Sequence, residues 1–317
     1  MFISFVIPVY RSENTIVRVI DEIKSVISTR ANIDYEIICI NDCSPDGVFS
    51  VLESLAINDK KIKVIDFAKN MGKHAAVLAG YMIATGDYVV TLDDDYQSPV
   101  CNLWMLIDPL EKDLCDVTTA NYTQKKQSWW KKIGSNFNHF VTNFLLDKPH
   151  DLRFDNFNAM KLFVAKEISK YKNPYPFLDG LIVRTTGRIL AIEMEERTRA
   201  DDNTTGYTLK KSIDLFFNGF TSFSVKPLRI STTIGFAAAV LGFLWAIITF
   251  IKKIINPLVE IGYTSTLIII LILGGLILMS QGMLGEYVGR IYICLNASPQ
   301  YVIRRTINIE EDTYTQR

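Results

Sequence analysis

The stretch "YVVTLDDDYQSP", residues 88–99, decides the fold and points to the chemistry. Its first five residues predict a buried β-strand. Three consecutive acids, Asp93, Asp94 and Asp95, follow at the carboxyl end of that strand. Adjacent ionised carboxylates repel one another, and a divalent cation with oxygen ligands commonly relieves the repulsion. The stretch therefore predicts a metal site, with a solvated acidic turn as the alternative.

The spacing of the acids indicates which side chains bind the metal. In extended backbone, alternate side chains point the same way, so we expect Asp93, Asp95 and Gln97 to converge while Asp94 faces elsewhere. Two carboxylates and an amide leave room for water and substrate oxygens. This set suits Mg²⁺ or Mn²⁺ bridging a diphosphate, where the metal neutralises charge on a departing phosphate.

Outward from this strand, residues 1–121 alternate short apolar runs with amphipathic helical patterns. Such a rhythm predicts an α/β domain with a Rossmann-like, mostly parallel sheet that gathers ligands at the carboxyl ends of its strands. At one of these ends, Lys73 and a glycine enter a helix and can contact a diphosphate. The predicted strands are "FISFVIPV" (2–9), "YEIICI" (35–40), "IKVIDF" (62–67), "DYVVTL" (87–92) and "CDVTTA" (115–120).

Two long apolar segments lie near the C-terminus. Residues 230–251 and 261–285 contain 22 and 25 uncharged residues, and each is long enough to cross a hydrocarbon core of about 30 Å. A buried helical hairpin in a soluble protein is the alternative. Basic residues favour the outer ends of the pair, which predicts that both termini are cytoplasmic. These residues are Lys210, Lys211, Lys226, Arg229, Arg290, Arg304 and Arg305, against Lys252 and Lys253 between the segments.

The predicted organisation has five parts: a catalytic α/β domain (1–205), an interfacial amphipathic helix (206–229), two transmembrane helices (230–251 and 261–285) and a cytoplasmic tail (286–317). A second amphipathic stretch, residues 124–146, carries lysines beside Trp129 and Trp130. It suits either a membrane surface or an ordinary core-facing helix.

Composition excludes some classes of function. Lys plus Arg and Asp plus Glu both number 34 among 317 residues, so no basic excess favours nucleic acid. The five cysteines are odd in number and scattered, which is typical of reduced cytosolic thiols. The sequence therefore describes an ordered domain with a membrane appendage rather than a nucleic-acid-binding or secreted protein.

Five motifs, in order, resemble one family along nearly the whole chain. They are "IPVYRSE" (7–13), "NDCSPDG" (41–47), "KNMGKHAAVLAGYMIATGDYVVTLDDDYQSP" (69–99), "KPLR" (226–229) and "GEYVGRIY" (285–292). The chain resembles the GT-A family 2 glycosyltransferases. Within them it is most similar to the membrane-bound polyprenyl-phosphate sugar transferases related to dolichol-phosphate mannose synthase and the bacterial bactoprenol glucosyltransferases.

The resemblance implies a set of site residues and a reaction. It implies transfer of a sugar from a nucleoside diphosphate, with UDP favoured over GDP, to a polyprenyl phosphate such as undecaprenyl phosphate, with inversion. Metal and donor diphosphate would be held by Asp93, Asp95 and Gln97, with Asp93 and Asp95 as the catalytic acids. The nucleotide would contact Pro8, Tyr10, Glu13 and Asp42. Basic candidates for the diphosphate or the acceptor phosphate are Lys73, Lys131, Lys132, Arg197, Arg199 and Lys211.

Two stretches depart from the family pattern. In "FDNFNAMK" (154–161), Asn156 stands where relatives often have an acid, which weakens the case for a protein base. In "RTRADDNTTGYTLKK" (197–211) the family's basic motif is altered, so either Arg197 or Arg199 would face the diphosphate. A lipid monophosphate has a second pKa near about 6 and is largely a dianion at neutral pH, so the reaction requires no strong base.

Other functions and the cellular setting complete the sequence-based predictions. A non-catalytic nucleotide-sugar-binding subunit of a lipid-sugar flippase complex is the main alternative, and a processive polysaccharide synthase is another. Two spans make a poor channel for a synthase. The expected location is a bacterial inner membrane in a multi-pass arrangement, and the resemblance implies a homo-oligomer such as a tetramer.

Overall fold

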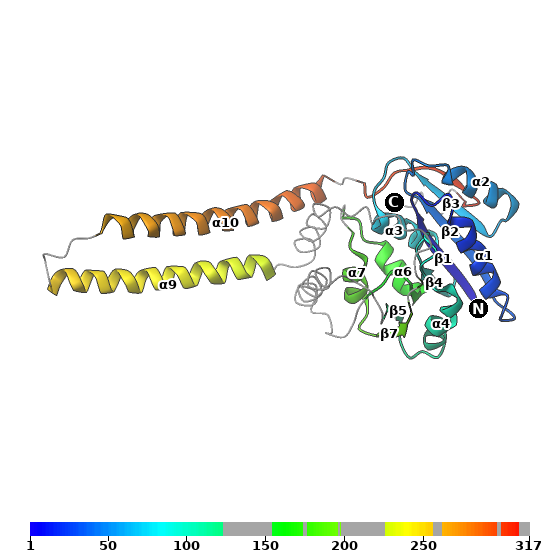
Figure 1. Ribbon diagram of the computed structural model, residues 1–317, viewed down its shortest axis with the longest axis horizontal. Coiled ribbons are helices and arrows are strands. Elements are labelled where there is room, and N and C mark those ends of the chain that lie inside the picture. The colour runs from blue at the N-terminus through cyan, green and yellow to red at the C-terminus, as the bar shows by residue number, and fades with distance from the viewer. Residues whose placement is uncertain are drawn as a thin grey trace. The chain divides into compact units, whose positions relative to one another are not determined.

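The computed structural model describes residues 1–122, 154–173, 176–195, 197, 226–255, 262–296 and 299–310 (Figure 1). The chain forms two compact units. The sheet unit comprises Met1–Tyr207 and Ser298–Arg317, and the hairpin unit comprises Thr208–Ala297. The amphipathic stretch at 124–146 lies outside the described residues, and so does the interfacial helix predicted at 206–229, apart from its last four positions.

In the part of the chain that the structure describes, the sheet unit holds one eight-stranded sheet in the order β7-β5-β6-β4-β1-β2-β3-β8. Neighbouring strands from β3 through β2 and β1 to β4 are parallel, whereas β6 and β8 pair antiparallel to their neighbours. The strands are β1 (Phe2–Val9), β2 (Asp34–Asn41), β3 (Ile62–Phe67), β4 (Tyr88–Thr91), β5 (Val117–Tyr122), β6 (Asn158–Lys161), β7 (Ile189–Met194) and β8 (Ile303–Ile307). The predicted Rossmann-like α/β fold is confirmed.

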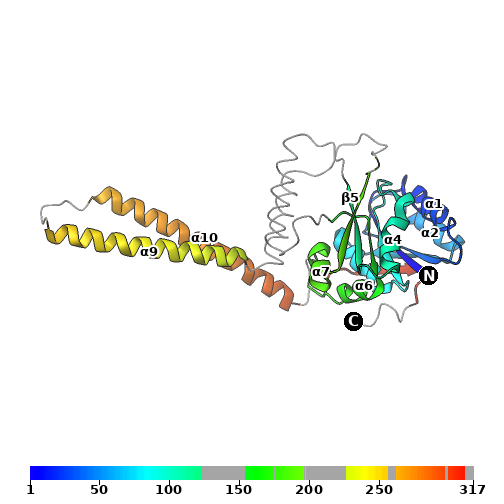
Figure 2. The same cartoon turned by 90° about the horizontal axis from the view of Figure 1, so that it is seen from below.

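Helices cover both faces of this sheet. Alternate β1 residues such as Ile3, Phe5 and Ile7 join one buried core with the apolar residues of α1, α2 and α4. Helices α1 and α2 lie on the opposite side of the sheet from α6 and α7 (Figure 2). The helices of the sheet unit are α1 (Ile16–Ile27), α2 (Val48–Asn58), α3 (Lys73–Ile83), the 3₁₀ turn η1 (Val100–Asn102), α4 (Leu103–Glu111), α6 (Leu162–Ser169) and α7 (Leu178–Thr185).

Helix α3 lies unusually close to the sheet because of Gly80. A Cβ atom at this position would lie 2.3 Å from Val6 Cγ1 and 3.0 Å from Ile40 Cδ1. Real side chains do not approach that closely, so glycine is required for the helix to pack directly on β1 and β2. This packing fixes the N-terminus of α3, and with it Lys73, at the carboxyl edge of the sheet.

Strand β8 corrects the prediction of a simple tail after residue 286. Helix α10 continues to Leu295, and residues Ile303–Ile307 then pair antiparallel with β3. Tyr301 stacks on Phe67 with ring centroids 5.0 Å apart, and the Ala68 N–H donates to the Val302 carbonyl over 2.8 Å. The chain therefore leaves the sheet unit before the hairpin and returns to the same sheet after it.

In its described residues the hairpin unit holds α9 (Lys226–Ile255) and α10 (Tyr263–Leu295), which lie side by side in both views. Apart from Gly262, which caps α10, both predicted apolar segments are helical wherever they are described. The hydroxyls of Ser231 and Ser280 are 2.8 Å apart and join the two helices. Many large apolar side chains point outward, including Phe236, Phe243, Trp245, Phe250, Ile272 and Leu278.

Within the residues described here, no helix meets the length and apolarity needed to cross a membrane. The crossings predicted for residues 230–251 and 261–285 are not supported by that measure.

Candidate active site

The site is built where parallel strands end. Tyr10 is the first residue after β1, Asp42 is the first after β2, and Asp93 is the second after β4. Because these three strands are parallel neighbours, their carboxyl ends meet at one edge of the sheet, where ligands gather in α/β folds. The sequence-based placement of the acids at a strand end is confirmed.

Asp93 is held by two donors from different elements. Lys73, the first residue of α3, donates from its ammonium to Asp93 Oδ1. The side-chain amide of Asn156 donates to Asp93 Oδ2 over 2.6 Å. Asp93 and Lys73 are partly buried, with 22% and 35% of their side-chain surfaces exposed. A carboxylate with one cation and one neutral donor already in place is fixed in orientation.

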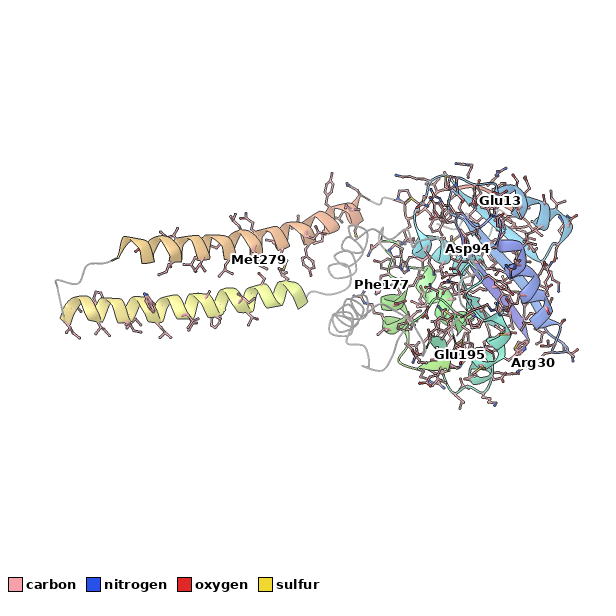
Figure 3. The ribbon with its side chains drawn as sticks, in the orientation of Figure 1. Glu13, Arg30, Asp94, Phe177, Glu195 and Met279 are labelled. Carbon is pink, nitrogen blue, oxygen red and sulfur yellow. The ribbon has the colours of Figure 1, made fainter. Side chains whose placement is uncertain are left out.

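Asp94 faces away from these donors, as the alternation of side chains predicts. Its carboxylate lies inside the sheet unit (Figure 3) and accepts from the Tyr10 N–H over 2.8 Å. Its carbonyl accepts from the Thr15 hydroxyl over 2.6 Å. Burial raises the pKa of Asp94 to about 6, and the adjacent acids Asp93 and Asp95 add to the rise. The middle acid therefore secures the loop between β1 and α1.

Gln97 does not follow the strand geometry used to predict it. Strand β4 ends at Thr91, and Tyr96 has a φ of 63°, in the left-handed region. The Gln97 N–H donates to Asp95 Oδ1 over 3.1 Å, which closes a tight turn around Tyr96. Period-two alternation therefore stops before Gln97, and its role as a metal ligand stays a prediction.

Two arginines brace this turn. The guanidinium groups of Arg18 and Arg197 lie 4.4 Å and 4.5 Å from the centroid of the Tyr96 ring. Arg197 also donates to both carboxylate oxygens of Glu22 over 2.8 Å each, and this pairing raises the pKa of Arg197. Arg197 therefore links α1 to the turn at Tyr96, and its contact with a diphosphate stays a prediction.

Asp42 organises the loop that leads into α3. Its two carboxylate oxygens accept from the backbone N–H groups of Met71 and Gly72 over 2.7 Å and 2.8 Å. Burial raises the pKa of Asp42, although both N–H donors oppose the rise. Gly72 has a φ of 86°, which favours glycine, and it directly precedes Lys73. Asp42 therefore positions the lysine that reaches Asp93.

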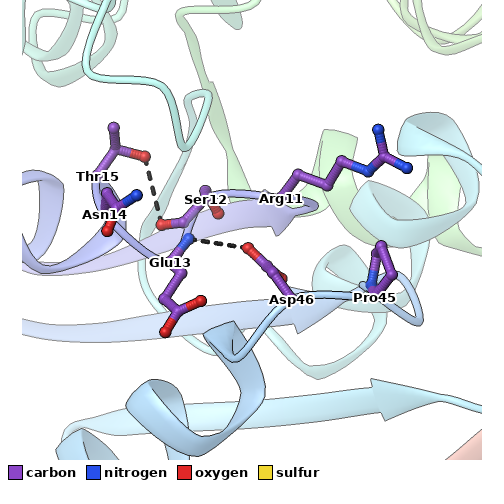
Figure 4. A pocket seen from close by; sticks show the side chains of 7 residues that line it. All are labelled: Arg11, Ser12, Glu13, Asn14, Thr15, Pro45 and Asp46. Carbon is purple, nitrogen blue, oxygen red and sulfur yellow. Dashed lines mark hydrogen bonds between the residues drawn. The ribbon is translucent and has the colours of Figure 1, made fainter.

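Glu13 ties together the loops that follow β1 and β2. It accepts from the Gly47 N–H over 3.0 Å, and its own N–H donates to Asp46 over 3.1 Å. A pocket of about 490 Å³ opens beside these contacts, lined by Arg11, Ser12, Glu13, Asn14, Thr15, Pro45 and Asp46 (Figure 4). Among the predicted nucleotide residues, Pro8 is buried in β1, and Tyr10 is 43% exposed beside this loop.

The donor set fits a metal that the substrate helps to bind. Across the described residues there is no group of three or more histidines, cysteines or acids able to enclose a metal. Asp93, Asp95 and Gln97 would supply only part of an octahedral shell, and Mg²⁺ usually takes its remaining ligands from water and substrate phosphates. Asp93 already holds a cation, the Lys73 ammonium, so its environment accepts positive charge.

Four predicted site residues lie outside the described residues: Arg199, Lys131, Lys132 and Lys211. Their roles stay predictions. The contacts that sequence reasoning missed come from positions with ordinary local signals. Thr15, Arg18, Glu22 and Asp46 lie in the β1–α1 and β2–α2 segments and acquire partners only through the fold.

Comparison with known proteins agrees with this architecture. Residues 4–169 match the family described as glycosyl transferase family 2, and residues 226–291 match the GtrB C-terminal hairpin. The chain is 31% identical over 313 residues to a prophage bactoprenol glucosyl transferase homolog of Escherichia coli, covering 96% of this chain and 99% of that protein. It is 28% identical to the undecaprenyl-phosphate 4-deoxy-4-formamido-L-arabinose transferase of Proteus mirabilis, covering 99% and 96%.

The fold also has a solved counterpart. Glucosyl-3-phosphoglycerate synthase from Mycobacterium tuberculosis, crystallised with Mn²⁺, UDP and phosphoglyceric acid, superimposes with a TM-score of 0.50 at 18% identity, covering 68% of this chain and 75% of that one. At this identity the likeness supports the fold alone. The match to residues 4–169 spans more than half of the chain, and the relatives align along nearly all of it. The chain therefore belongs to glycosyl transferase family 2 and is a glycosyltransferase.

Proposed function

We propose that this enzyme transfers a sugar from a nucleoside diphosphate, with UDP as the favoured carrier, to a polyprenyl phosphate such as undecaprenyl phosphate. The observation that carries the proposal is the pairing of Asp93 with Lys73 and Asn156 at the sheet edge, in a chain that also carries an apolar hairpin. Support comes from two full-length relatives whose names include bactoprenol and undecaprenyl phosphate. A structural counterpart holds Mn²⁺ with UDP.

Asp93, Asp95 and Gln97 would hold Mg²⁺ or Mn²⁺ in this proposal. Bound there, the metal would neutralise negative charge that develops on the departing diphosphate. Lys73 adds a second positive charge at the same carboxylate, from a helix that Gly80 fixes against the sheet. Asp94 and Thr15 keep the β1–α1 loop in place beside the acids. Electrostatics and positioning therefore carry the catalysis.

Asn156 shapes the mechanism because a neutral amide cannot take a proton as a general base. Its N–H donates to Asp93 instead, and so it orients a residue of the site. An acceptor phosphate that is already largely a dianion at neutral pH needs no deprotonation before it attacks. Attack from the face opposite the departing diphosphate inverts the anomeric centre. Lys131, Lys132, Arg199 and Lys211 remain the proposed contacts for phosphate groups.

The proposal places α9 and α10 in a bacterial inner membrane, with both termini in the cytoplasm. Its support is the run of uncharged residues in each helix, the outward-pointing aromatic and aliphatic side chains, and the match to the GtrB hairpin. The return of β8 to the sheet means that both ends of the hairpin begin from one folded unit. A polyprenyl phosphate exposes its phosphate at the headgroup level, where such an anchor would hold the active site. Homo-oligomers, such as tetramers, belong to this proposal.

An assay of purified enzyme in detergent tests the donor and the metal. Labelled UDP-glucose, UDP-galactose and GDP-mannose are each incubated with undecaprenyl phosphate, with Mg²⁺, with Mn²⁺ or with EDTA. We expect a chloroform-soluble sugar lipid from a UDP-sugar with metal and none with EDTA. Product formation at full rate in EDTA would refute the metal, and product from GDP-mannose alone would refute UDP as the carrier.

A further inference from the structure

A bulge in strand β8 changes the direction of one arginine side chain, which lies at the carboxyl ends of β2 and β3. In the β3–β8 pairing, Asp66 lies opposite Arg305 and Phe67 lies opposite Ile303, which leaves Arg304 as the extra residue between them. A β-bulge bends its strand and re-aims the side chain of the extra residue, often beside an active site. Arg304 therefore departs from the regular alternation of an edge strand.

The guanidinium of Arg304 lies at the carboxyl ends of β2 and β3. Its Nη2 donates to the Ala68 carbonyl over 3.2 Å and lies 4.0 Å from Cys43 Sγ. Ala68 is the residue after β3, and Cys43 is the residue after Asp42. The side chain stays 53% exposed, and its Nη1 is 3.7 Å from the buried carboxylate of Asp66. A guanidinium has five N–H donors in a rigid fork, so these contacts leave donors for a ligand.

The distance from Asp93 indicates which part of a nucleotide Arg304 would meet. Strand β8 is four strands from β4 in the sheet, which is about 19 Å at the usual spacing between strands. A diphosphate held at Asp93 therefore lies beyond reach of Arg304. The nucleoside end of a donor that extends from β4 across β1 and β2 would arrive beside Asp42 and Arg304.

We propose that Arg304, supplied by the strand after the hairpin, donates hydrogen bonds to a base carbonyl oxygen of the uridine donor. This inference rests on the proposed function. A guanidinium only donates hydrogen bonds, so it suits an acceptor such as a carbonyl oxygen of uracil. Arg304 is thus a binding residue for the base, distinct from the residues around the acids.

Arg305 provides a matched control because it is also an arginine, adjacent in the same strand, and its side chain is 49% exposed. Its guanidinium stacks on the Phe49 ring at 3.6 Å and contacts Asp66 over 3.3 Å, so it fastens β8 to α2 and β3. The test measures the Kd of UMP and of UDP for the full chain in detergent, with Mg²⁺ present, in the wild type, Arg304→Ala and Arg305→Ala. Thermal unfolding of all three proteins is recorded in parallel.

We expect Arg304→Ala to raise the Kd of UMP and the Kd of UDP by the same factor, about tenfold, because a charge-assisted hydrogen bond is lost. Arg305→Ala should lower the unfolding temperature and leave both affinities unchanged. Equal affinities in wild type and Arg304→Ala would overturn the inference while leaving the proposed function intact. A loss confined to UDP would also overturn it, because Arg304 would then contact the diphosphate. A wild type that binds neither nucleotide would overturn both proposals.

Discussion

The sheet unit and the hairpin unit contain similar apolar residues, but the sheet unit buries their side chains and the hairpin unit exposes many of them. In the sheet unit, side chains such as Phe5, Ile20 and Ile37 are completely buried between strands and helices. In the hairpin unit, Phe236 and Phe243 are 71% and 69% exposed. Burial of apolar surface stabilises a fold in water by about 25 cal/mol per Å², so an exposed apolar surface marks a site of contact with a protein partner or a membrane. The two units therefore differ in whether water or protein surrounds their apolar side chains in this structure.

The largest expected effect lies in the sheet unit, where the chemistry is. The substitution Asp95→Asn nearly keeps the side-chain volume and removes one carboxylate from the proposed metal ligands. We expect kcat for sugar-lipid formation to fall at least about 100-fold, the scale of losing one electrostatic contact to a transition state. The rate is measured with saturating donor and metal. Unfolding temperature and membrane association should match those of the wild type, and a variant with full activity would remove Asp95 from the mechanism.

The next prediction compares two exposed isoleucines, one in each unit. Ile272 of α10 is 58% exposed and Ile57 of α2 is 66% exposed. If α10 lies in lipid, Ile272→Arg should make the free energy of membrane insertion about 3 kcal/mol less favourable, because a charge within a bilayer loses its hydration. Ile57→Arg should leave both stability and membrane recovery almost unchanged, because this exposed side chain lies in water. The measurement is the fraction of expressed protein recovered in membranes, and identical recovery of the two variants would contradict the lipid setting of the hairpin.

A glycine pair tests packing in the two units. Gly80→Ala places a Cβ 2.3 Å from Val6 Cγ1, whereas a Cβ at Gly282 meets nothing within 4 Å. Overpacking of this kind costs about 1–3 kcal/mol, so Gly80→Ala should lower the unfolding temperature and displace Lys73. Gly282→Ala should be neutral or slightly stabilising, since alanine favours helix. Unfolding followed by circular dichroism compares them. Equal stabilities would show that α3 does not need its close approach to β1.

The smallest expected effect is a pH dependence confined to the sheet unit. Burial, and then the neighbouring Lys73, lower the pKa of His74 to about 4 from 6.5. As the pH falls, the unfolded chain therefore takes up the proton first, so stability is complete above pH 6.5 and declines toward pH 4. The loss is at most about 2 kcal/mol at pH 5. His74→Phe should flatten this acid limb of the unfolding temperature, and an unchanged limb would assign it to other groups.

Much of the sheet could be predicted from the sequence, because its strands have local apolar patterns. The runs at 2–9 and 62–67 coincide with β1 and β3, since fully buried parallel strands are continuous apolar runs. Strand β8 was missed for the opposite reason. The segment "IRRTI" has two arginines and a partner more than 230 residues earlier, and nothing local distinguishes an edge strand from a charged tail.

The sequence predicted only those features of the site that depend on local patterns. Asp93 and Asp94 have different partners, as the expected alternation of side chains predicts, although both lie beyond the last residue of β4. The turn at Tyr96 ended that alternation before Gln97, and a left-handed residue other than glycine gives no clear signal in sequence. The contact between Arg197 and Glu22 joins residues 175 positions apart, so only the fold reveals it. A long-range pair of this kind cannot be inferred from spacing.

The acceptor is the central claim, because it unites the two units in one reaction. The direct measurement offers purified full-length enzyme its sugar donor with three acceptors in parallel: undecaprenyl phosphate, undecaprenol and 3-phosphoglycerate, the soluble acid related to the ligand of its structural counterpart. We predict labelled product from undecaprenyl phosphate alone, because the reaction needs both the phosphate and the lipid. Transfer to 3-phosphoglycerate with none to undecaprenyl phosphate would contradict the account.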